Sequence, residues 1–307
     1  MKRSTKISLI VATALLVAGC IFFLGGMAML NWDFSSWSTF SYVTNHHTPE
    51  GTFSNISIEA DTADIVFLPS ENGSCTVECY ELEKAQHSVT VQNGTLQIRV
   101  EDNRKWYEYI GINFGNPKIT VYLPQAQYEE LAIRSSTGDV TIQHPYTFEN
   151  VQITLSTGDI QISNLSAHTA YLSVSTGKIT VSDSECSDLL NVFVTTGKSH
   201  LKNITCQIFS SGGGTGDVSL ENVIAAGTMT ILRSTGDITL SGCDAGEIII
   251  ETDTGDVTGM ILTEKIFYAH TDTGRVEVPN TKTGGRCEIT TDTGDIRITV
   301  NMRGVLS

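Results

Sequence analysis

The dipeptide Thr-Gly recurs at nearly constant spacing through the second half of this chain of 307 residues. Nine copies follow one another at intervals of 19 or 20 residues, with the threonine at Thr137, Thr157, Thr176, Thr196, Thr215, Thr235, Thr254, Thr273 and Thr293. A fixed period of this length is typical of solenoids, in which each repeat forms one coil and stacks on its neighbours. A further pair, Thr283-Gly284, lies out of register, and we expect it to be incidental.

Apolar and polar residues alternate on both sides of each Thr-Gly pair. This period of two predicts strands with one buried face. The buried positions are six and four residues before the threonine and three and five residues after it, as in Val151/Ile153, Phe267/Ala269, Ile160/Ile162 and Val276/Val278. Each coil should contain a strand, a tight turn, a second strand and a polar return loop such as 241–246. One dry interior should hold Ile153, Leu172, Val192 and Ile250.

A glycine follows the threonine in each turn, at Gly138, Gly158, Gly177, Gly197, Gly216, Gly236, Gly255, Gly274 and Gly294. The tight turn needs a positive φ here, which penalises any Cβ, so we expect Gly138→Val or Gly236→Val to damage the fold. Two short strands cannot bury their own apolar side, and only stacking gives them a core. Nine coils about 4.8 Å apart would form a rod of roughly 43 Å.

Residues 51–130 lack the regular repeat and predict a β-rich cap over the open end of the solenoid. A degenerate first coil spans 61–67, where Ala63 replaces the turn glycine, and strands are expected at 75–82, 88–92, 95–100 and 118–124. Asn93-Gly94 between two of them signals a two-residue hairpin. An aromatic group follows, and it fits either a binding patch or, as we favour, packing over the cap core: Trp106, Tyr107, Tyr109 and Phe114.

Residues 7–30 contain no charged side chain and follow the basic Lys2, Arg3 and Lys6. A run of this length can cross a membrane as one helix, and the positive flank would keep residues 1–6 in the cytoplasm. Residues 31–50 would form a juxtamembrane linker, and the regular coils would occupy 131–307 outside the cytoplasm. Two alternatives are a cleaved signal peptide and a lipoprotein box at 17–20, in which Cys20 would be lipidated.

The composition excludes several classes of function. A net charge of −15 argues against a nucleic-acid partner, because phosphate recognition needs a basic face. The same charge would repel anionic wall polymers unless cations bridged them. No nucleophile elbow, His-Glu-x-x-His or Cys-x-x-Cys site occurs, and 212–216 leads into a strand where a phosphate-binding loop needs a helix. We therefore expect no catalytic residue and no cofactor, and we predict that the protein is not an enzyme.

Aspartates two residues after the repeat threonine form a row, which Lys178, Lys198 and Arg275 interrupt. A second row joins it near the C-terminus, and the candidates for a calcium site there are Asp253, Asp256, Asp292 and Asp295. The calcium-binding nonapeptide of other solenoids is missing, so we favour the alternative that these aspartates are solvated turn caps. A carboxylate pair for glycan cleavage fits less well, since the aspartates mark every turn and not one groove.

Seven cysteines are present, and none belongs to a metal-binding motif. Cys75 and Cys79 are four residues apart in one expected strand, about 13 Å, which is too far for a disulfide. Cys186 and Cys206 each follow their repeat threonine by ten residues, so they should stack on adjacent coils within disulfide range. They form either a disulfide or a ladder of two small buried residues.

These features resemble a family of bacterial membrane-anchored β-strand-repeat proteins of unknown function, nicknamed adhesins. The resemblance covers nearly the whole chain. It rests on the basic start and apolar anchor, on Asn31-Trp32-Asp33-Phe34, on segments 93–98 and 119–124, and on the Ser-Thr-Gly-Asp-Ile repeats. It implies a location in the cell envelope, sometimes beside regulators of envelope stress, and it brings no catalytic residues.

The sequence thus predicts an all-β protein with one transmembrane helix, a β-rich cap and a single parallel β-solenoid of about nine coils. We expect a non-enzymatic, adhesin-like interaction module of the cell membrane, single-pass with a cytoplasmic N-terminus, that contacts an envelope protein or a cell-wall polymer. One alternative is an accessory protein of an envelope-stress sensor, which would need a membrane partner because six cytoplasmic residues are too few to signal. The other is a glycan-acting β-helical enzyme.

Overall fold

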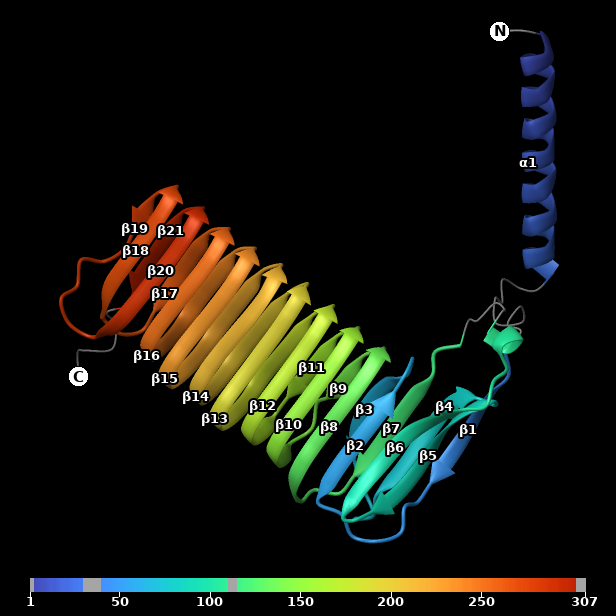
Figure 1. Cartoon of the computed structure of the whole chain (residues 1–307), viewed down its shortest axis with the longest axis horizontal. Coiled ribbons are helices and arrows are strands. Elements are labelled where there is room, and N and C mark those ends of the chain that lie inside the picture. The colour runs from blue at the N-terminus through green and yellow to red at the C-terminus, as the bar shows by residue number, and fades with distance from the viewer. Residues whose placement is uncertain (1–2, 30–39, 110–114, 302–307) are drawn as a thin grey trace.

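The computed structural model describes residues 3–29, 40–109 and 115–301. One helix, α1 (Arg3–Met29), precedes a β-solenoid of about nine turns that forms a rod (Figure 1). This confirms the predicted fold class. The stretch Leu9–Met29 is long and apolar enough to cross a membrane, as an anchor or a signal sequence would be. Residues 31–34 and Phe114 lie outside the described parts of the chain.

Equivalent strands of successive coils pair in parallel and in register, so each residue lies beside its counterpart one repeat away. Ile153 pairs with Leu172, and Leu172 pairs with Val192. The strands of the regular coils are β8 (Gln127–Thr137), β9 (Val140–Ile142), β10 (Tyr146–Thr157), β11 (Ile160–Ser163), β12 (Leu165–Thr176), β13 (Ile179–Thr196), β14 (Ser199–Thr215), β15 (Val218–Thr235), β16 (Ile238–Thr254) and β17 (Val257–Ile261).

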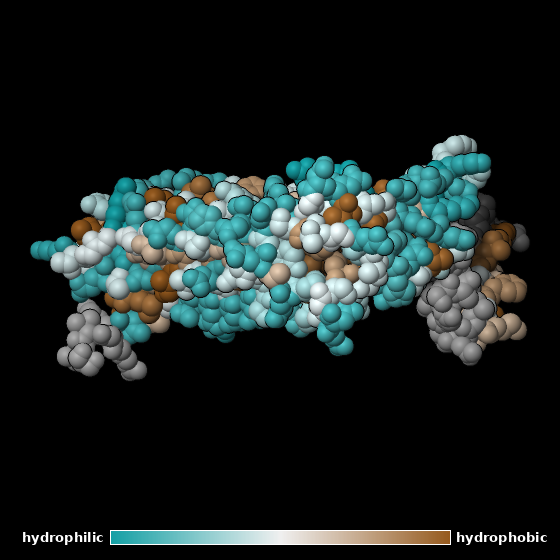
Figure 2. Space-filling model, turned by 90° about the horizontal axis from the view of Figure 1, so that it is seen from below, coloured by the Kyte–Doolittle hydropathy of each residue, from teal (hydrophilic) through white to brown (hydrophobic). Residues whose placement is uncertain are grey.

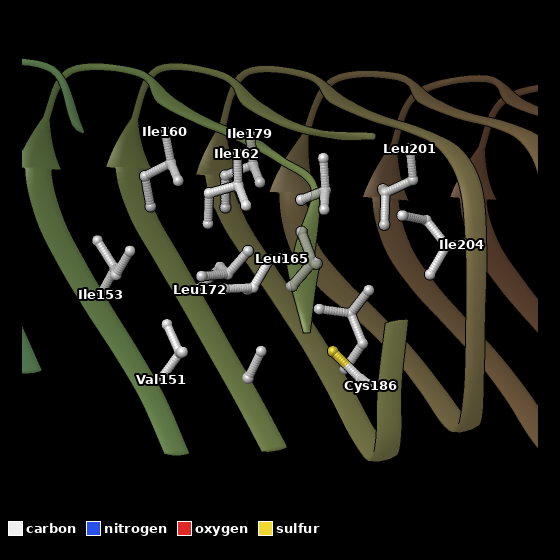
Figure 3. Packing of buried hydrophobic residues seen from close by; sticks show 14 of the residues in the cluster. Val151, Ile153, Ile160, Ile162, Leu165, Leu172, Ile179, Cys186, Leu201 and Ile204 are labelled. Atoms are coloured by element: carbon white, nitrogen blue, oxygen red, sulfur yellow. The ribbon is translucent and has the colours of Figure 1, made fainter. Parts of the chain in front are cut away.

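The aliphatic pairs of the repeat line one continuous core. Ile153, Leu172, Val192 and Ile250 are all at most 1% exposed, as predicted. Figure 3 shows Ile153 and Leu172 pointing into the interior from one side of the coils, and Ile160 and Ile162 pointing in from another. Each such aliphatic side chain contributes about 1.5–3 kcal/mol by leaving water.

In the coils of Thr176, Thr196, Thr215 and Thr235 the return segment is strand, and the prediction of a polar loop there is wrong. β13 to β16 run through it without a break, and its inward residues are buried, as in Ile204/Cys206, Val223/Ala225 and Cys243/Ala245. The polar residues that suggested a loop sit at one corner, where the backbone has positive φ: Asn164, Asp183, Asn203 and Asn222. Asn and Asp tolerate this conformation better than other non-glycine residues, so the corner needs no loop.

The glycines of the Thr-Gly turns form a column along the rod, and all nine have φ between 121° and 154°. The coils approach so closely here that an added Cβ would collide with backbone; at Gly236 it would meet the carbonyl oxygen of Gly216. Both the conformation and the spacing therefore require glycine, as the repeat predicts.

The last two coils stack in exchanged order. β20 (Gly285–Thr293) lies between β16 and β18 (Lys265–Thr273), and β21 (Ile296–Val300) lies between β17 and β19 (Val276–Glu277). The coil of Thr273 therefore ends the rod, although Thr293 follows it in the sequence (Figure 1).

This exchange decides which of the two coils is buried. Ile289 and Ile296 of the inner coil are fully buried, whereas Val276 of the end coil is 41% exposed, so its predicted burial is wrong. The chain re-enters the stack at Gly284 and Gly285, where a Cβ would collide with the carbonyl oxygens of Glu264 and Gly246. The out-of-register Thr-Gly pair, expected to be incidental, thus begins this crossing.

The N-terminal strands close the opposite end of the rod. They are β1 (Tyr42–His47), β2 (Asn55–Ala60), β3 (Asp64–Pro69), β4 (Thr76–Leu82), β5 (Ala85–Gln92), β6 (Thr95–Asp102) and β7 (Lys118–Leu123). β2 and β3 form the degenerate first coil and stack on β8 and β9. β5 and β6 form the predicted hairpin, with φ of 51° at Asn93 and 74° at Gly94. β4 pairs antiparallel with β1 and β7 and so departs from the solenoid pattern.

One arginine is buried inside the solenoid and explains the glycine at position 213. The guanidinium of Arg233 donates to the carbonyl oxygens of Val194 (3.0 Å) and Gly212 (2.9 Å) and to the hydroxyls of Ser199 and Ser211. A Cβ at Gly213 would collide with Nη1 of Arg233. The missing side chain therefore makes room for the guanidinium one coil away.

We expect Gly236→Ala to lower the free energy of unfolding by at least about 3 kcal/mol, because it combines a strained positive φ with a backbone collision. Urea unfolding of the detergent-solubilised full-length protein measures this. The matched control is Gly242→Asn, since Gly242 also has positive φ, its Cβ would meet nothing within 4 Å, and equivalent corners hold Asn164, Asn203 and Asn222. Equal losses in both variants would contradict the role of the glycine column.

Candidate functional site

The row of aspartates at the Thr-Gly turns forms a hydrogen-bonded ladder. Each carboxylate accepts a hydrogen bond from the backbone N–H at the same position of the next coil. Asp139 Oδ1 accepts from Asp159 N at 2.8 Å, and Asp256 Oδ1 accepts from Asp295 N at 2.7 Å. These carboxylates therefore join coils, in agreement with the reading as turn caps.

Basic residues supply counter-charges along this edge. Lys198 Nζ lies 2.8 Å from Asp217 Oδ2, and this pair lowers the pKa of Asp217 and raises that of Lys198. At the end of the rod Asp295 accepts from the backbone N–H of Arg275 at 2.9 Å, which with the charges of Arg275 and Arg297 outweighs desolvation and lowers its pKa. Like charges along the ladder are thus partly neutralised by protein groups.

The four aspartates proposed for calcium do not gather at one point. Asp256 and Asp295 belong to the ladder, while Asp253 and Asp292 lie on the exposed row beside it. Over residues 3–29, 40–109 and 115–301, no group of three or more close metal-binding donors includes any of them. The ladder bonds account for this acidic edge.

Cys186 and Cys206 lie side by side on β13 and β14, as their spacing predicts. Both are buried free thiols, and burial raises the pKa of each to about 12. The equivalent residues of other coils are the small Ala167, Ala225 and Ala245. A narrow corner of the coil therefore selects small side chains in this row.

The aromatic group after β6 does not pack over the cap core, and the interpretation that we favoured is wrong for its described members. Trp106, Tyr107 and Tyr109 lie on a short 3₁₀ helix, η2 (Trp106–Tyr109), which has no buried residue, and Trp106 is 78% exposed. Tyr109 donates to Asp102 at 2.9 Å, and Arg104 lies over its ring. Local polar contacts, not the core, hold this turn.

A cluster that sequence reasoning missed lies inside the cap. The metal-binding donor atoms of His47, Cys79 and Glu81 lie within 4.8 Å of one another, and this is the one such group in the described part of the chain. The signal was in the alternation of β4, which sends Val77, Cys79 and Glu81 to the same buried face. A buried glutamate needs polar partners, so its position indicated a site. The partner strand β1, which supplies His47, was hidden because residues 31–50 were predicted to form a linker.

We expect Asp256→Ala to lower the free energy of unfolding by about 1 kcal/mol, because the Asp295 N–H loses its acceptor. The matched variant Asp256→Asn keeps an oxygen acceptor and should stay close to the wild type. Thermal unfolding with calcium chloride and with chelator separates this ladder from a calcium site. A calcium-dependent rise in Tm that Asp256→Asn abolishes would contradict the ladder interpretation.

Comparisons with known proteins agree with this architecture. A solved structure from Parabacteroides distasonis, described as a putative lipid binding protein, is 13% identical, with a TM-score of 0.53 over 85% of this chain and 98% of that chain. Structures described as putative adhesins come from Bacteroides fragilis (18% identity, TM-score 0.42, 84% and 97% covered) and Parabacteroides merdae (10%, 0.44, 84% and 96%). At 13% identity the likeness to the Parabacteroides distasonis structure shows a shared fold alone.

No curated protein matches the chain. The family model described as Toastrack DUF4097 matches it over residues 53–242 and 209–304, which includes the cap from β2 onward and all regular coils. The chain therefore belongs to the Toastrack DUF4097 family, a family of unknown function.

Proposed function

We propose that this protein is a non-enzymatic interaction module of the bacterial cell envelope, which α1 holds at the membrane while the rod contacts a partner protein. The apolar stretch of α1 and the basic residues before it support an anchor with a cytoplasmic N-terminus. The cap follows α1 in the chain, so the end coil of Thr273 is the end farthest from the anchor along the rod.

The observation that carries this proposal is an uncharged face on an acidic protein. On five consecutive coils the outward residues seven, five and three positions before the repeat threonine carry no charge, and we call them the neutral face: Asn150, Gln152, Thr154, Thr169, Tyr171, Ser173, Leu189, Asn191, Phe193, Ile208, Ser210, Gly212, Thr228, Thr230 and Leu232. Charged residues border it, with Glu130 and Arg134 on one side and Glu247 and Glu251 on the other.

Large apolar side chains project from four adjacent coils of the neutral face. Tyr171, Phe193, Ile208 and Leu232 are 40–46% exposed. Phe193 and Leu232 occupy the same row on either side of Gly212, and the Phe193 ring lies over Gly212, where an added Cβ would come within 3.0 Å of it. Single exposed apolar residues are common, and Figure 2 shows several scattered among hydrophilic ones on one face of the rod. Several on adjacent coils without intervening charge are typical of a contact surface.

The size and rigidity of the neutral face suit a protein partner. Five coils at about 4.8 Å by five residues at about 3.3 Å give roughly 20 by 13 Å, the central part of a standard interface. A hydrogen-bonded sheet loses little conformational entropy on binding. Little of the binding free energy from an aromatic anchor such as Phe193 is therefore lost to ordering the surface. The net charge of −15 disfavours an anionic wall polymer as the partner.

Site-specific crosslinking in intact cells tests the proposal. A photo-crosslinking side chain at Ser210 should give a discrete adduct with one envelope protein, and Phe193→Asp with Leu232→Asp should reduce its yield at least tenfold. The matched control places the crosslinker at Gln161, an exposed residue of β11 outside the neutral face. An adduct that survives the double substitution, or that forms equally from Gln161, would contradict a contact through this face.

A further inference from the structure

A buried group of unlike metal-binding donors lies between the first cap strand and β4. Cys79 and Glu81 project from the same face of β4 and are at most 1% exposed. β1 pairs with β4 so that His47 is opposite Val77, which places its ring diagonally next to Cys79. The imidazole, thiol and carboxylate donors are all within 4.8 Å of one another.

One of these donors has no partner within the protein. Nε2 of His47 is buried and makes no hydrogen bond, although a buried imidazole nitrogen normally has one. The neighbouring His87 also has an unpartnered buried Nε2, and its side chain is only 5% exposed. A bound cation would satisfy the His47 nitrogen, which the protein itself leaves unpaired.

The carboxylate of Glu81 is held in place from two sides. Asn45 Nδ2 donates to Oε1 at 2.7 Å, and the backbone N–H of His87 donates to Oε2 at 2.6 Å, with His87 Nδ1 also 2.6 Å away. Burial opposes ionisation of Glu81, but these hydrogen bonds outweigh it and lower its pKa. The group is therefore a fixed, buried anion, oriented as second-shell partners orient a metal ligand.

Cys79 faces this anion directly. Burial, and then the charges of Glu81 and Glu78, raise the pKa of the Cys79 thiol to about 12. Without a cation the sulfur stays protonated, because a thiolate beside a buried carboxylate is strongly disfavoured. A divalent cation between them would reverse that balance, and the thiol proton would pass to solvent on binding.

We propose that His47 Nε2, Cys79 Sγ and Glu81 bind one divalent transition-metal ion, for which Zn²⁺ fits best. One nitrogen, one thiolate and one carboxylate form a borderline donor set that suits zinc, and the two anionic ligands neutralise its charge. Metal–ligand bonds of about 2.0–2.3 Å would draw the donors to about 3.5 Å apart, a movement of about an ångström from the largest separation. A fourth position remains for water.

The site would fasten the first strand of the cap. Among the described strands β1 pairs with β4 alone. His47 is the last residue of β1 and is half-buried, so the ion can enter as this strand end frays. A metal bound to both strands would then resist separation of β1, the strand nearest the anchor in the sequence, from the rest of the cap.

Cobalt titration of the reduced, detergent-solubilised full-length protein tests this site. CoCl₂ should bind with one equivalent per chain and give thiolate-to-cobalt charge-transfer absorption, and Zn²⁺ should displace it. Cys79→Ser should abolish that absorption, and His47→Gln should weaken binding at least about tenfold.

Two variants serve as matched controls. Cys75→Ser removes another buried thiol four residues away, and His46→Ala removes the adjacent histidine, whose side chain is 63% exposed. Both should bind cobalt like the wild type. The proposal is overturned if the wild type shows no cobalt–thiolate absorption, or if His47→Gln keeps full affinity. The second criterion holds even if Cys79→Ser fails to fold, because His47 lies at the end of an edge strand.

Discussion

Parallel, in-register pairing of the coils is the constraint on which the rest of this structure depends. Because each residue lies about 4.8 Å from its counterpart in the next coil, each side chain must fit against its counterparts in the coils on either side. The glycine column shows this most clearly, since a Cβ at one turn would enter the carbonyl oxygen of the turn beside it. The same pairing converts a row of aspartates, which would otherwise repel, into a ladder of hydrogen bonds to backbone N–H groups.

Departures from the repeat are compensated in the neighbouring coil. Arg233 can be buried because Gly213 lacks a side chain, and Gly284 with Gly285 lets the chain pass between coils already stacked. In the exchange of the last two coils, the coil with Ile289 and Ile296 occupies the inner place and the coil with Val276 ends the rod. A residue that looks irregular in sequence is thus explained by its neighbour in the next coil, about 20 residues away, and not by its own repeat.

The two proposals use different parts of the architecture. The neutral face depends on regular stacking, which aligns uncharged outward residues of five coils into one rigid surface. The proposed metal site depends on the loss of regularity in the cap, where antiparallel pairing of β1 and β4 brings His47 to Cys79 and Glu81. A regular stack places equivalent positions of the repeat side by side. Histidine, cysteine and glutamate donors therefore meet where strands of different sequence pair, as β1 and β4 do.

The sequence by itself determined the solenoid, its coil boundaries, the turn glycines, the Asn93-Gly94 hairpin and the apolar N-terminal helix. Each of these follows from a local pattern: a repeated period, a turn preference or an uninterrupted apolar run. Only the tertiary structure decided the order of the last coils, the strand character of the return segments, the burial of Arg233 and the meeting of His47 with Cys79. These depend on contacts between residues far apart in sequence, and on which of several similar coils buries the most apolar surface, and no local pattern records either.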